Sequence, residues 1–183
     1  MHIDAFFAAC YNFRKDLHGR SAYVHRNSAR LSPHARYGRQ GPGVHGLERE
    51  VELAAQALGV DGARIAKSLS FRQGEGCILV LAAGDARVDN KKFKARFGMK
   101  PSMLHAEEVE PLTGHPVGGV CPFGRRAGVP VYLDESLRRF ETVFPACGSA
   151  ASAIELTMDE LYALSEAEAW VDVCKLPEQG DVS

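Results

Sequence analysis

The feature that most constrains the fold of this chain is a continuous apolar run, CILVLAA, at residues 77–83. It follows the segment RIAKSLSF at 64–71, in which apolar and polar side chains alternate, and the glycine-containing stretch RQGEG separates the two segments. Alternation is typical of a strand with one buried face, and an unbroken apolar run is typical of a strand buried on both faces. The sequence therefore predicts a β-hairpin whose second strand lies in the core.

Two helices are predicted around this hairpin. Apolar residues at 51–58 have helical spacing, and Gly59 follows them, where a helix commonly ends in the left-handed conformation. After the hairpin, Asp89 is a suitable N-cap for a helix that runs through Phe97, with Gly98 beyond it. The predicted order is thus helix, hairpin, helix.

Strand and helix signals stay interleaved in the rest of the chain. Strands are predicted at 129–133 and 142–146, and the capping box of Thr157 and Glu160 predicts a helix that runs through Leu164. With 183 residues, of which 45% are hydrophobic, the chain suits one domain with its own core. We therefore expect a single α+β domain with a mixed sheet.

Composition excludes several classes of protein and site. No apolar run approaches the roughly 20 residues of a membrane helix, and the N-terminus does not have the layout of a signal peptide, so a cytoplasmic protein is expected. The five cysteines are far apart and without zinc-type spacing, so neither structural disulfides nor a metal site is expected. A formal net charge of −1 argues against a protein that grips long duplex nucleic acid, and a nucleic-acid partner would be held locally.

The first part of the chain differs from the rest. A short amphipathic helix is predicted at 3–10, but the stretch 18–46 mixes Arg, His, Ser, Gly and Pro without a period, as loops and disordered segments do. We therefore divide the chain into an atypical N-terminal segment at 1–47, a domain at 48–164 and a C-terminal tail at 165–183. Two hypotheses account for the N-terminal segment: a misread or out-of-frame start, and a lineage-specific loop.

One lysine stands on the predicted apolar face of the first hairpin strand. Lys67 shares that face with Ile65, Leu69 and Phe71. An ammonium group among apolar side chains is costly unless a partner compensates, so such a lysine lines a pocket, meets an anion or has a lowered pKa. The alternative is an edge-strand lysine whose amine reaches water.

A second candidate site is the loop GHPVGGVCPFG at 114–124, which holds four glycines and two prolines. Glycines let a backbone approach a ligand closely. Successive N–H groups of Gly118, Gly119 and Val120 can form a nest for a carbonyl oxygen or a phosphate, and Pro122 would stiffen it. A plain connector is the alternative interpretation of the same glycines.

The same loop raises the hypothesis of a thiol nucleophile. Cys121 lies in it, and His115 is close enough in the sequence to act as a base. No third residue that would orient the histidine stands at a recognisable spacing, and an unreactive buried cysteine is the commoner state. Catalysis by Cys121 is therefore kept only as an alternative.

Basic side chains are clustered on and just after the predicted helix at 89–97, whose two phenylalanines would face the core. This leaves a basic outer face suited to a few phosphates, although many such faces are simply solvated. The basic residues are Lys91, Lys92, Lys94, Arg96 and Lys100.

Five segments, taken in order, resemble the YbaK/ProX family, the bacterial trans-editing deacylases related to the insertion domain of prolyl-tRNA synthetase. The similarity runs from about Glu48 to Leu164. The ordered combination is far more specific than any single motif. The segments are VELAAQALGV, RIAKSLSF, VLAAGDARVDNKKFKARFG, TGHPVGGVCPFG and VPVYLDESL.

The resemblance implies a compact α+β domain with a strongly curved mixed sheet, whose pocket receives the 3′-terminal adenosine of a tRNA and its esterified amino acid. It also implies ester hydrolysis without a metal or any other cofactor. Lys67 resembles the family's pocket lysine, and the segment from Gly118 to Pro122 resembles its GXXXP loop, which positions the aminoacyl carbonyl. The expected partners are an aminoacylated tRNA and an aminoacyl-tRNA synthetase, with no membrane.

These residues lead to a predicted mechanism. Lys67 anchors the terminal ribose-phosphate region, and the N–H groups of residues 118–120 stabilise the tetrahedral oxyanion. The attack comes from water activated by the substrate's own ribose hydroxyl, or from the thiol of a cysteinyl substrate. Because a synthetase pocket gains only about 1–3 kcal/mol against an amino acid that differs by one methylene, the expected substrate is a small misacylated amino acid of the alanine, cysteine or serine type.

Two departures from the family limit what carries over. Family members have an acidic residue shortly before the final apolar strand, where this chain has Ala153, and their N-terminal pocket tyrosine has no counterpart in residues 1–47. A catalytically decayed tRNA-binding module of the same fold is therefore the alternative function. The candidate substrate-binding residues are His115, Cys121, Pro122, Asp134 and Gly148.

Overall fold

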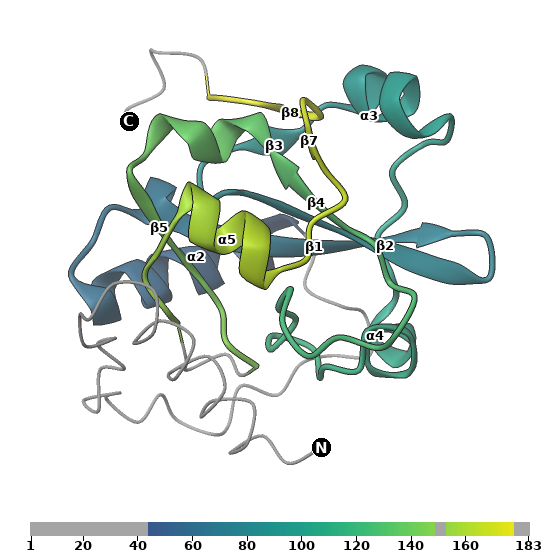
Figure 1. Cartoon of the computed structure of the whole chain (residues 1–183), viewed down its shortest axis with the longest axis horizontal. Helices are drawn as coiled ribbons and strands as arrows, with labels where there is room; N and C mark the ends of the chain where they lie inside the picture. Colours follow the sequence, from purple (N-terminus) through teal and green to yellow (C-terminus); the bar gives the residue numbers. More distant parts are fainter. Residues whose placement is uncertain (1–43, 149–152, 178–183) are drawn as a thin grey trace.

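The computed structural model describes residues 44–148 and 153–177 of the chain (Figure 1). The predicted helix at 3–10 and the two hypotheses about the N-terminal segment fall almost wholly outside these residues. The described elements, in chain order, are α2 (Val44–Leu58), η1 (Gly62–Arg64), β1 (Ile65–Gln73), β2 (Gly76–Ala83), β3 (Arg87–Val88), α3 (Asn90–Phe97), α4 (Ala106–Thr113), β4 (Val131–Asp134), η2 (Glu135–Arg139), β5 (Thr142–Pro145), β6 (Leu156–Thr157), α5 (Met158–Leu164), β7 (Ala169–Val171) and β8 (Cys174–Lys175).

Six strands form one mixed, curved sheet in the order β6-β5-β1-β2-β4-β7, and β3 pairs with β8 beside it. β1 is antiparallel to β2 and parallel to β5, while β4 is parallel to both β2 and β7. In Figure 1, α3 lies above this sheet and α4 lies below it. The predicted fold class, a single α+β domain with a mixed curved sheet, is confirmed.

The predicted hairpin is present. β1 and β2 pair from Ala66 opposite Ala83 to Gln73 opposite Gly76, so the strands extend further than predicted and the turn between them is only two residues. Residues 78–83 of β2 are completely buried, and β2 lies between β1 and β4 in the sheet. The unbroken apolar run is therefore the central strand, as a strand covered on both faces requires.

Three predicted helices are confirmed with their caps. Gly59 follows α2 with φ of 67°, and Gly98 follows α3 with φ of 72°. Asp89 accepts hydrogen bonds from two backbone N–H groups at the start of α3, and Thr157 and Glu160 form the predicted capping box of α5. Short polar side chains and glycines thus set the ends of these helices.

Four aromatic rings pack α3 against the sheet. The ring centroid of Phe93 in α3 lies 4.7 Å from that of Phe71 in β1, and 4.7 Å from that of Phe97, one turn further along the helix. The ring centroid of Phe97 lies 5.0 Å from that of Tyr132 in β4. Since these rings face the sheet, the lysines of α3 are left on its outer side.

The sequence reading missed α4 and the strands at the C-terminal end. Pro111 lies inside α4, where it interrupts the pattern that predicts a helix, although Glu108 accepts a hydrogen bond from the His105 N–H at 3.0 Å in a way typical of a helix start. β7 and β8 are too short to show a period, yet β7 extends the main sheet and β8 pairs with β3. The assignment of residues 169–175 to a tail is therefore corrected: they are part of the packed domain.

None of the helices in the described ranges is both long and apolar enough to cross a membrane.

Candidate functional site

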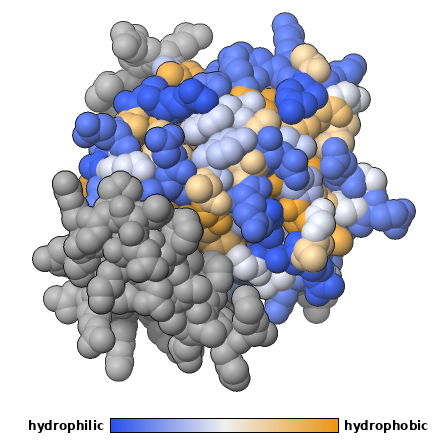
Figure 2. Space-filling view, viewed as in Figure 1, coloured by the Kyte–Doolittle hydropathy of each residue, from blue (hydrophilic) through white to orange (hydrophobic). Residues whose placement is uncertain are grey.

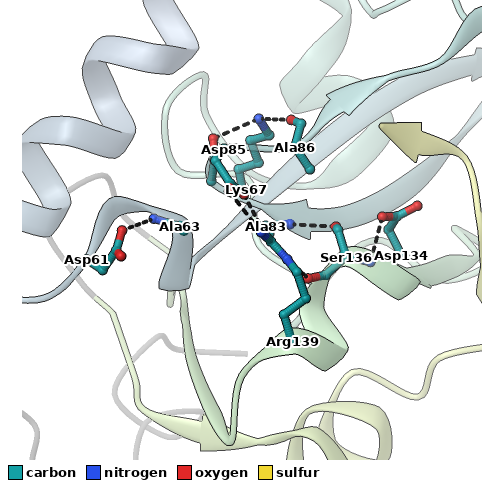
Figure 3. Close-up of polar contacts among 10 residues, drawn as sticks. Asp61, Ala63, Lys67, Ala83, Asp85, Ala86, Asp134, Ser136 and Arg139 are labelled. Carbon is teal, nitrogen blue, oxygen red and sulfur yellow. Dashed lines mark hydrogen bonds and ion pairs between the residues drawn. The ribbon is translucent and has the colours of Figure 1, made fainter. Parts of the chain in front are cut away.

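Lys67 lies near the start of β1 with its side chain half buried. Its Nζ donates one hydrogen bond to the carbonyl oxygen of Gly84, at 3.0 Å, and another to that of Ala86, both on the turn between β2 and β3 (Figure 3). An ammonium group has three N–H donors, and no described residue accepts the third. The alternative, an edge-strand lysine whose amine reaches water, does not match these contacts, because Nζ is turned to two backbone carbonyl groups.

The surroundings of Lys67 change its acidity. Burial lowers the pKa of Lys67, because removal from water disfavours the charged amine. The charges of Cys174, Asp85 and Glu48 oppose this shift without cancelling it. The amine is therefore a poorly hydrated cation donor, which gains more than an exposed lysine does from contact with an anionic ligand.

Ion pairs hold the turn at 84–86 from two sides. Asp85 accepts from the guanidinium group of Arg139, with one N–O distance of 3.0 Å, and this contact ties the turn to η2 (Figure 3). Next to it, Arg87 pairs with Glu48 of α2 at 2.8 Å. The carbonyl groups that bind Lys67 are thus carried by a braced turn.

Gly84 positions the carbonyl group that Lys67 binds, and the sequence did not predict this role. A Cβ atom at this position would lie 2.0 Å from the carbonyl oxygen of Gly62 and 2.8 Å from Cγ1 of Val51. The Gly84 N–H donates to the carbonyl oxygen of Ala63 at 3.2 Å, so the turn lies directly against η1 and α2. Only glycine allows this approach, and the approach places the carbonyl group that Lys67 binds. The glycine that follows the apolar run of β2 was the available signal.

Asp134 is buried at the end of β4, with 1% of its surface exposed. One carboxylate oxygen accepts from the Ser136 N–H at 3.0 Å, and the other accepts from the N–H groups of Val173 and Cys174 at 2.9 and 3.1 Å. The carboxylate therefore joins η2 and β8 to the sheet. Its predicted contact with substrate stays a prediction.

The glycine loop contains a tight turn. The Gly119 N–H donates to the carbonyl oxygen of Pro116 at 2.9 Å, and Gly118, inside the turn, has φ of 81°. Because this bond occupies the Gly119 N–H, that group cannot serve as an oxyanion donor in this conformation. The prediction of three donors is corrected to two, Gly118 and Val120, whose N–H groups have no hydrogen-bond partner among the described residues.

His115 and Cys121 meet in the loop, but not as a base and its nucleophile. His115 Nε2 lies 2.9 Å from the carbonyl oxygen of Phe123 and 3.6 Å from the Cys121 sulfur, and that thiol itself donates to the same carbonyl at 3.3 Å. A carbonyl oxygen only accepts, so Nε2 carries a hydrogen and cannot take the thiol proton. Burial lowers the pKa of His115, and its hydrogen bond to Phe123 opposes this shift. These contacts argue against the thiol-nucleophile alternative.

The basic residues of α3 fall into two groups. Lys92 Nζ pairs with Asp172 at 2.7 Å and donates to the Cys174 carbonyl at 3.0 Å, and Arg96 lies over the rings of Phe97 and Tyr132. By contrast, Lys91, Lys94 and Lys100 are exposed and have no ion-pair partner among the described residues. Hydrophilic side chains cover much of the upper part of the molecule in Figure 2, where Figure 1 places α3.

The remaining candidates lie near the loop or at the end of β5. Pro122 is buried in the loop, and Gly148 is half buried with φ of 86°. Ala153 pairs with Ala146 in an isolated bridge. None of the described hydrogen bonds joins Lys67 to the residues of the loop, so the predicted pocket between them stays a prediction. Within the described residues, no group of three or more His, Cys, Asp or Glu side chains is placed to hold a metal ion.

Comparison with known proteins gives a consistent result. The family model described as "Aminoacyl-tRNA editing domain" matches residues 45–164. The chain is 59% identical over 126 residues to the uncharacterised protein YwhH of Bacillus subtilis. This match covers 68% of this chain and 80% of YwhH. It is 29% identical over 119 residues to EbsC of Enterococcus faecalis, a proposed Cys-tRNA(Pro)/Cys-tRNA(Cys) deacylase, over 64% of this chain and 73% of EbsC.

A solved structure resembles the fold as well. The crystal structure of a proposed trans-editing enzyme for prolyl tRNA synthetase has 35% sequence identity and a TM-score of 0.61, and the match covers 74% of this chain and 84% of that one. The similarity therefore holds for sequence and for three-dimensional structure.

Proposed function

The chain belongs to the aminoacyl-tRNA editing domain family, and on that premise we propose that it hydrolyses the ester bond between a small misacylated amino acid and the 3′ end of a tRNA. The observation that carries this proposal is Lys67, a half-buried amine with a lowered pKa, fixed by two carbonyl groups and left with one donor. The name given to EbsC favours cysteine on tRNA(Pro) or tRNA(Cys) as the first substrate to test.

Each part of the candidate site has a role in this proposal. The free donor of Lys67 binds an oxygen of the terminal nucleotide, and its desolvated charge favours an anionic oxygen. As water or another hydroxyl attacks the ester carbon, negative charge collects on the carbonyl oxygen. The N–H groups of Gly118 and Val120 then stabilise that oxyanion, as preorganised backbone donors do in other acyl transfers. The neighbouring ribose hydroxyl takes the proton of the attacking water and passes its own proton to the esterified ribose oxygen. The bond between that oxygen and the ester carbon then breaks, which releases the free amino acid and the tRNA with both terminal hydroxyls.

The outer side of α3 is proposed to meet the tRNA backbone. Lys91, Lys94 and Lys100 have free charges, so they are the residues that contact phosphates in this proposal. Lys92 donates to the Cys174 carbonyl of β8, and β8 pairs with β3, which directly follows the turn at 84–86. The basic face is therefore connected to the Lys67 turn through β8. The chain resembles the solved structure of a proposed trans-editing enzyme for prolyl tRNA synthetase, which makes that synthetase the first partner to test.

The test is a deacylation assay with cysteinyl-, alanyl- and seryl-tRNA, in which the wild type is compared with Lys67→Ala. We expect hydrolysis of at least one of them, and a fall of about 100-fold in kcat/KM for the variant, the usual scale for one preorganised donor. The matched control is Arg138→Ala, which removes an exposed cation that pairs with Glu135 and lies over Trp170. Full activity of Lys67→Ala would refute the role of the lysine.

One observation favours a second candidate, a tRNA-binding module without catalysis. Ala153, where the family has an acidic residue, offers only a methyl group beside its bridge to Ala146. This candidate predicts that uncharged tRNA binds while no aminoacyl ester is hydrolysed above the buffer rate. The same assay, combined with a filter-binding measurement, separates the two functions.

A further inference from the structure

The main sheet has a break beside Lys67. On the side of β1 that faces away from β2, β5 pairs only with Ile65 and Ala66. Further along, the segment at 102–104 binds β1 only from Ser70 onward. Residues 67–69 therefore have no strand partner on that side among the described parts of the chain.

The pairing of β5 with β1 stops while β5 keeps its register with β6. Val143 lies opposite Leu156, and Ala146 lies opposite Ala153 in the same register, on the side of β5 away from β1. Pro145, opposite Ala66, is the last residue of β5 that pairs with β1. The break therefore lies between β1 and the end of β5.

The backbone of Ser68 faces this break. In an antiparallel strand, the N–H and C=O groups of alternate residues point to the same side. Ser70 accepts from Leu104 at 3.1 Å and Arg72 donates to Ser102 at 2.8 Å, both on the side away from β2. Ser68 lies two positions before Ser70 in the strand, so its N–H and C=O groups point to the same side as those of Ser70 and Arg72. No described residue binds the Ser68 groups there.

The side chain of Ser68 is unpaired as well. Its Oγ is the one buried side-chain N or O atom in the described residues that has no hydrogen-bond partner. A buried hydroxyl without a partner costs about 1–3 kcal/mol, so it calls for an explanation. Three polar groups of one residue are therefore unpaired, in the residue that follows Lys67 in the chain.

We propose that this break, defined by Ser68 between the two pairing segments of β1, is the subsite that takes the aminoacyl group of the substrate. The inference rests on the proposed function. An aminoacyl ester keeps the amino group and the carbonyl group of one residue, so it pairs with Ser68 as two residues do in an antiparallel ladder. The α-ammonium group donates to the Ser68 carbonyl, and the Ser68 N–H donates to the ester carbonyl oxygen of the bound substrate, the oxygen that the N–H groups of Gly118 and Val120 stabilise when it becomes negative. The Ser68 hydroxyl supplies a third bond to the aminoacyl group.

This arrangement explains how one site tolerates several small amino acids. The hydrogen bonds of the pair go to groups that every aminoacyl ester has, so they recognise the ester and not its side chain. Lys67 lies next in the chain, where its free donor meets the nucleotide to which the ester is attached. Discrimination among amino acids then depends on the size of the space beside the pair.

The first test changes the protein. Ser68→Ala removes the unpaired hydroxyl and should leave the melting temperature unchanged or higher, because a buried polar group without a partner is lost. The same change should raise KM or lower kcat/KM for the aminoacyl-tRNA by about tenfold, the effect of one hydrogen bond in the complex. Ser70→Ala is the matched control, since it removes a serine two residues further along β1, where the backbone is paired. If Ser68 had only a structural role, Ser68→Ala would lose activity only together with stability. Lost activity at an unchanged melting temperature therefore supports a contact with the substrate.

The second test changes the ligand and needs no folding of a variant. N-acetylation of the aminoacyl group removes the charged donor, and we expect it to lower kcat/KM of the wild type by about tenfold or more. A stable probe, 3′-deoxy-3′-(alanylamino)adenosine, allows binding to be measured by calorimetry without hydrolysis. It should bind the wild type and Ser70→Ala alike, and Ser68→Ala about tenfold more weakly.

The outcomes separate this inference from the proposed function. If the wild type hydrolyses aminoacyl-tRNA but neither Ser68→Ala nor N-acetylation has an effect, the subsite is refuted and the proposed function stands. If the probe binds in a Ser68-dependent way but no aminoacyl-tRNA is hydrolysed, the subsite stands and the proposed function fails. If neither hydrolysis nor binding is detected, both are refuted.

Discussion

In the turn at 84–86, two backbone carbonyl groups are directed at one side chain, Lys67, whereas in the loop at 114–124 two side chains, His115 and Cys121, are directed at one carbonyl group, that of Phe123. The lysine keeps an unused donor after its bonds are made. The imidazole N–H and the thiol both donate to the same acceptor. Residue types that suggest catalysis are therefore not enough, since the direction of each hydrogen bond decides which group stays available.

The largest expected effect tests the turn. Gly84→Ala would place a Cβ atom 2.0 Å from the Gly62 carbonyl oxygen, so the turn must move away from η1. We expect a loss of about 2–3 kcal/mol in the free energy of unfolding, the scale of overpacking in a core. Deacylation should fall as well, because the carbonyl group that binds Lys67 moves with the turn. Urea denaturation and the deacylation assay measure the two effects.

The control for this variant is Gly62→Ala. A Cβ atom there would meet Val51 and Ala55 at 3.7 and 3.9 Å, which are ordinary contacts. Its free energy of unfolding should stay within about 1 kcal/mol of the wild type. Equal losses in the two variants would contradict the claim that the close approach at Gly84 builds the lysine site.

A smaller effect is expected for Gly118→Ala in the loop. Gly118 has φ of 81°, and an alanine in this left-handed region costs about 1–2 kcal/mol. Because this cost distorts the turn closed by the hydrogen bond from Gly119 to Pro116, the oxyanion donors move, and kcat should fall by about tenfold. KM should change little, because the loop acts on the transition state. A rise in KM with constant kcat would instead assign the loop to substrate binding.

The two regions also differed in how well the sequence predicted them. Lys67 could be found because a strand period places one charge on an apolar face, and the glycines of the loop were evident from composition. The acceptors of Lys67 were not predicted, since Gly84 and Ala86 bind it through backbone carbonyl groups. The glycine at 84 was a signal for a close backbone approach but not for the group that it binds, and Ala86 gave no signal at all. The occupied N–H of Gly119 was hidden for the same reason.

The helices and strands also differ in how well the sequence predicted them. Long elements with a clear period or caps, such as the β1–β2 hairpin and α3, were predicted nearly to their ends. β7 and β8 were missed because strands of two or three residues carry no period, and they depend on pairing with distant partners. The break at Ser68 likewise depends on where two neighbouring segments stop, which no local pattern records.

A pH dependence follows from His115. Burial lowers its pKa below the ordinary value of 6.5. As the pH falls below 6.5, the unfolded chain binds a proton that the folded protein does not, so the free energy of unfolding decreases until the folded-state pKa is passed. His115→Gln keeps an N–H that donates to Phe123 and does not titrate. Urea denaturation between pH 7.5 and 5 should therefore show a steeper loss for the wild type than for the variant; parallel curves would contradict the buried neutral imidazole.

The smallest effect is expected for Cys121→Ser, and it decides whether the loop contains a nucleophile. The serine hydroxyl donates to the Phe123 carbonyl as the thiol does, so the loop keeps its hydrogen bond. We expect kcat/KM for deacylation to stay within about twofold of the wild type, because ΔG differences below roughly 0.5 kcal/mol correspond to changes of that size. A thiol nucleophile would form an acyl-enzyme, and its loss would abolish turnover. An inactive but folded Cys121→Ser would therefore overturn the distinction between the two regions, since the loop would then hold the reacting group and Lys67 would only support it.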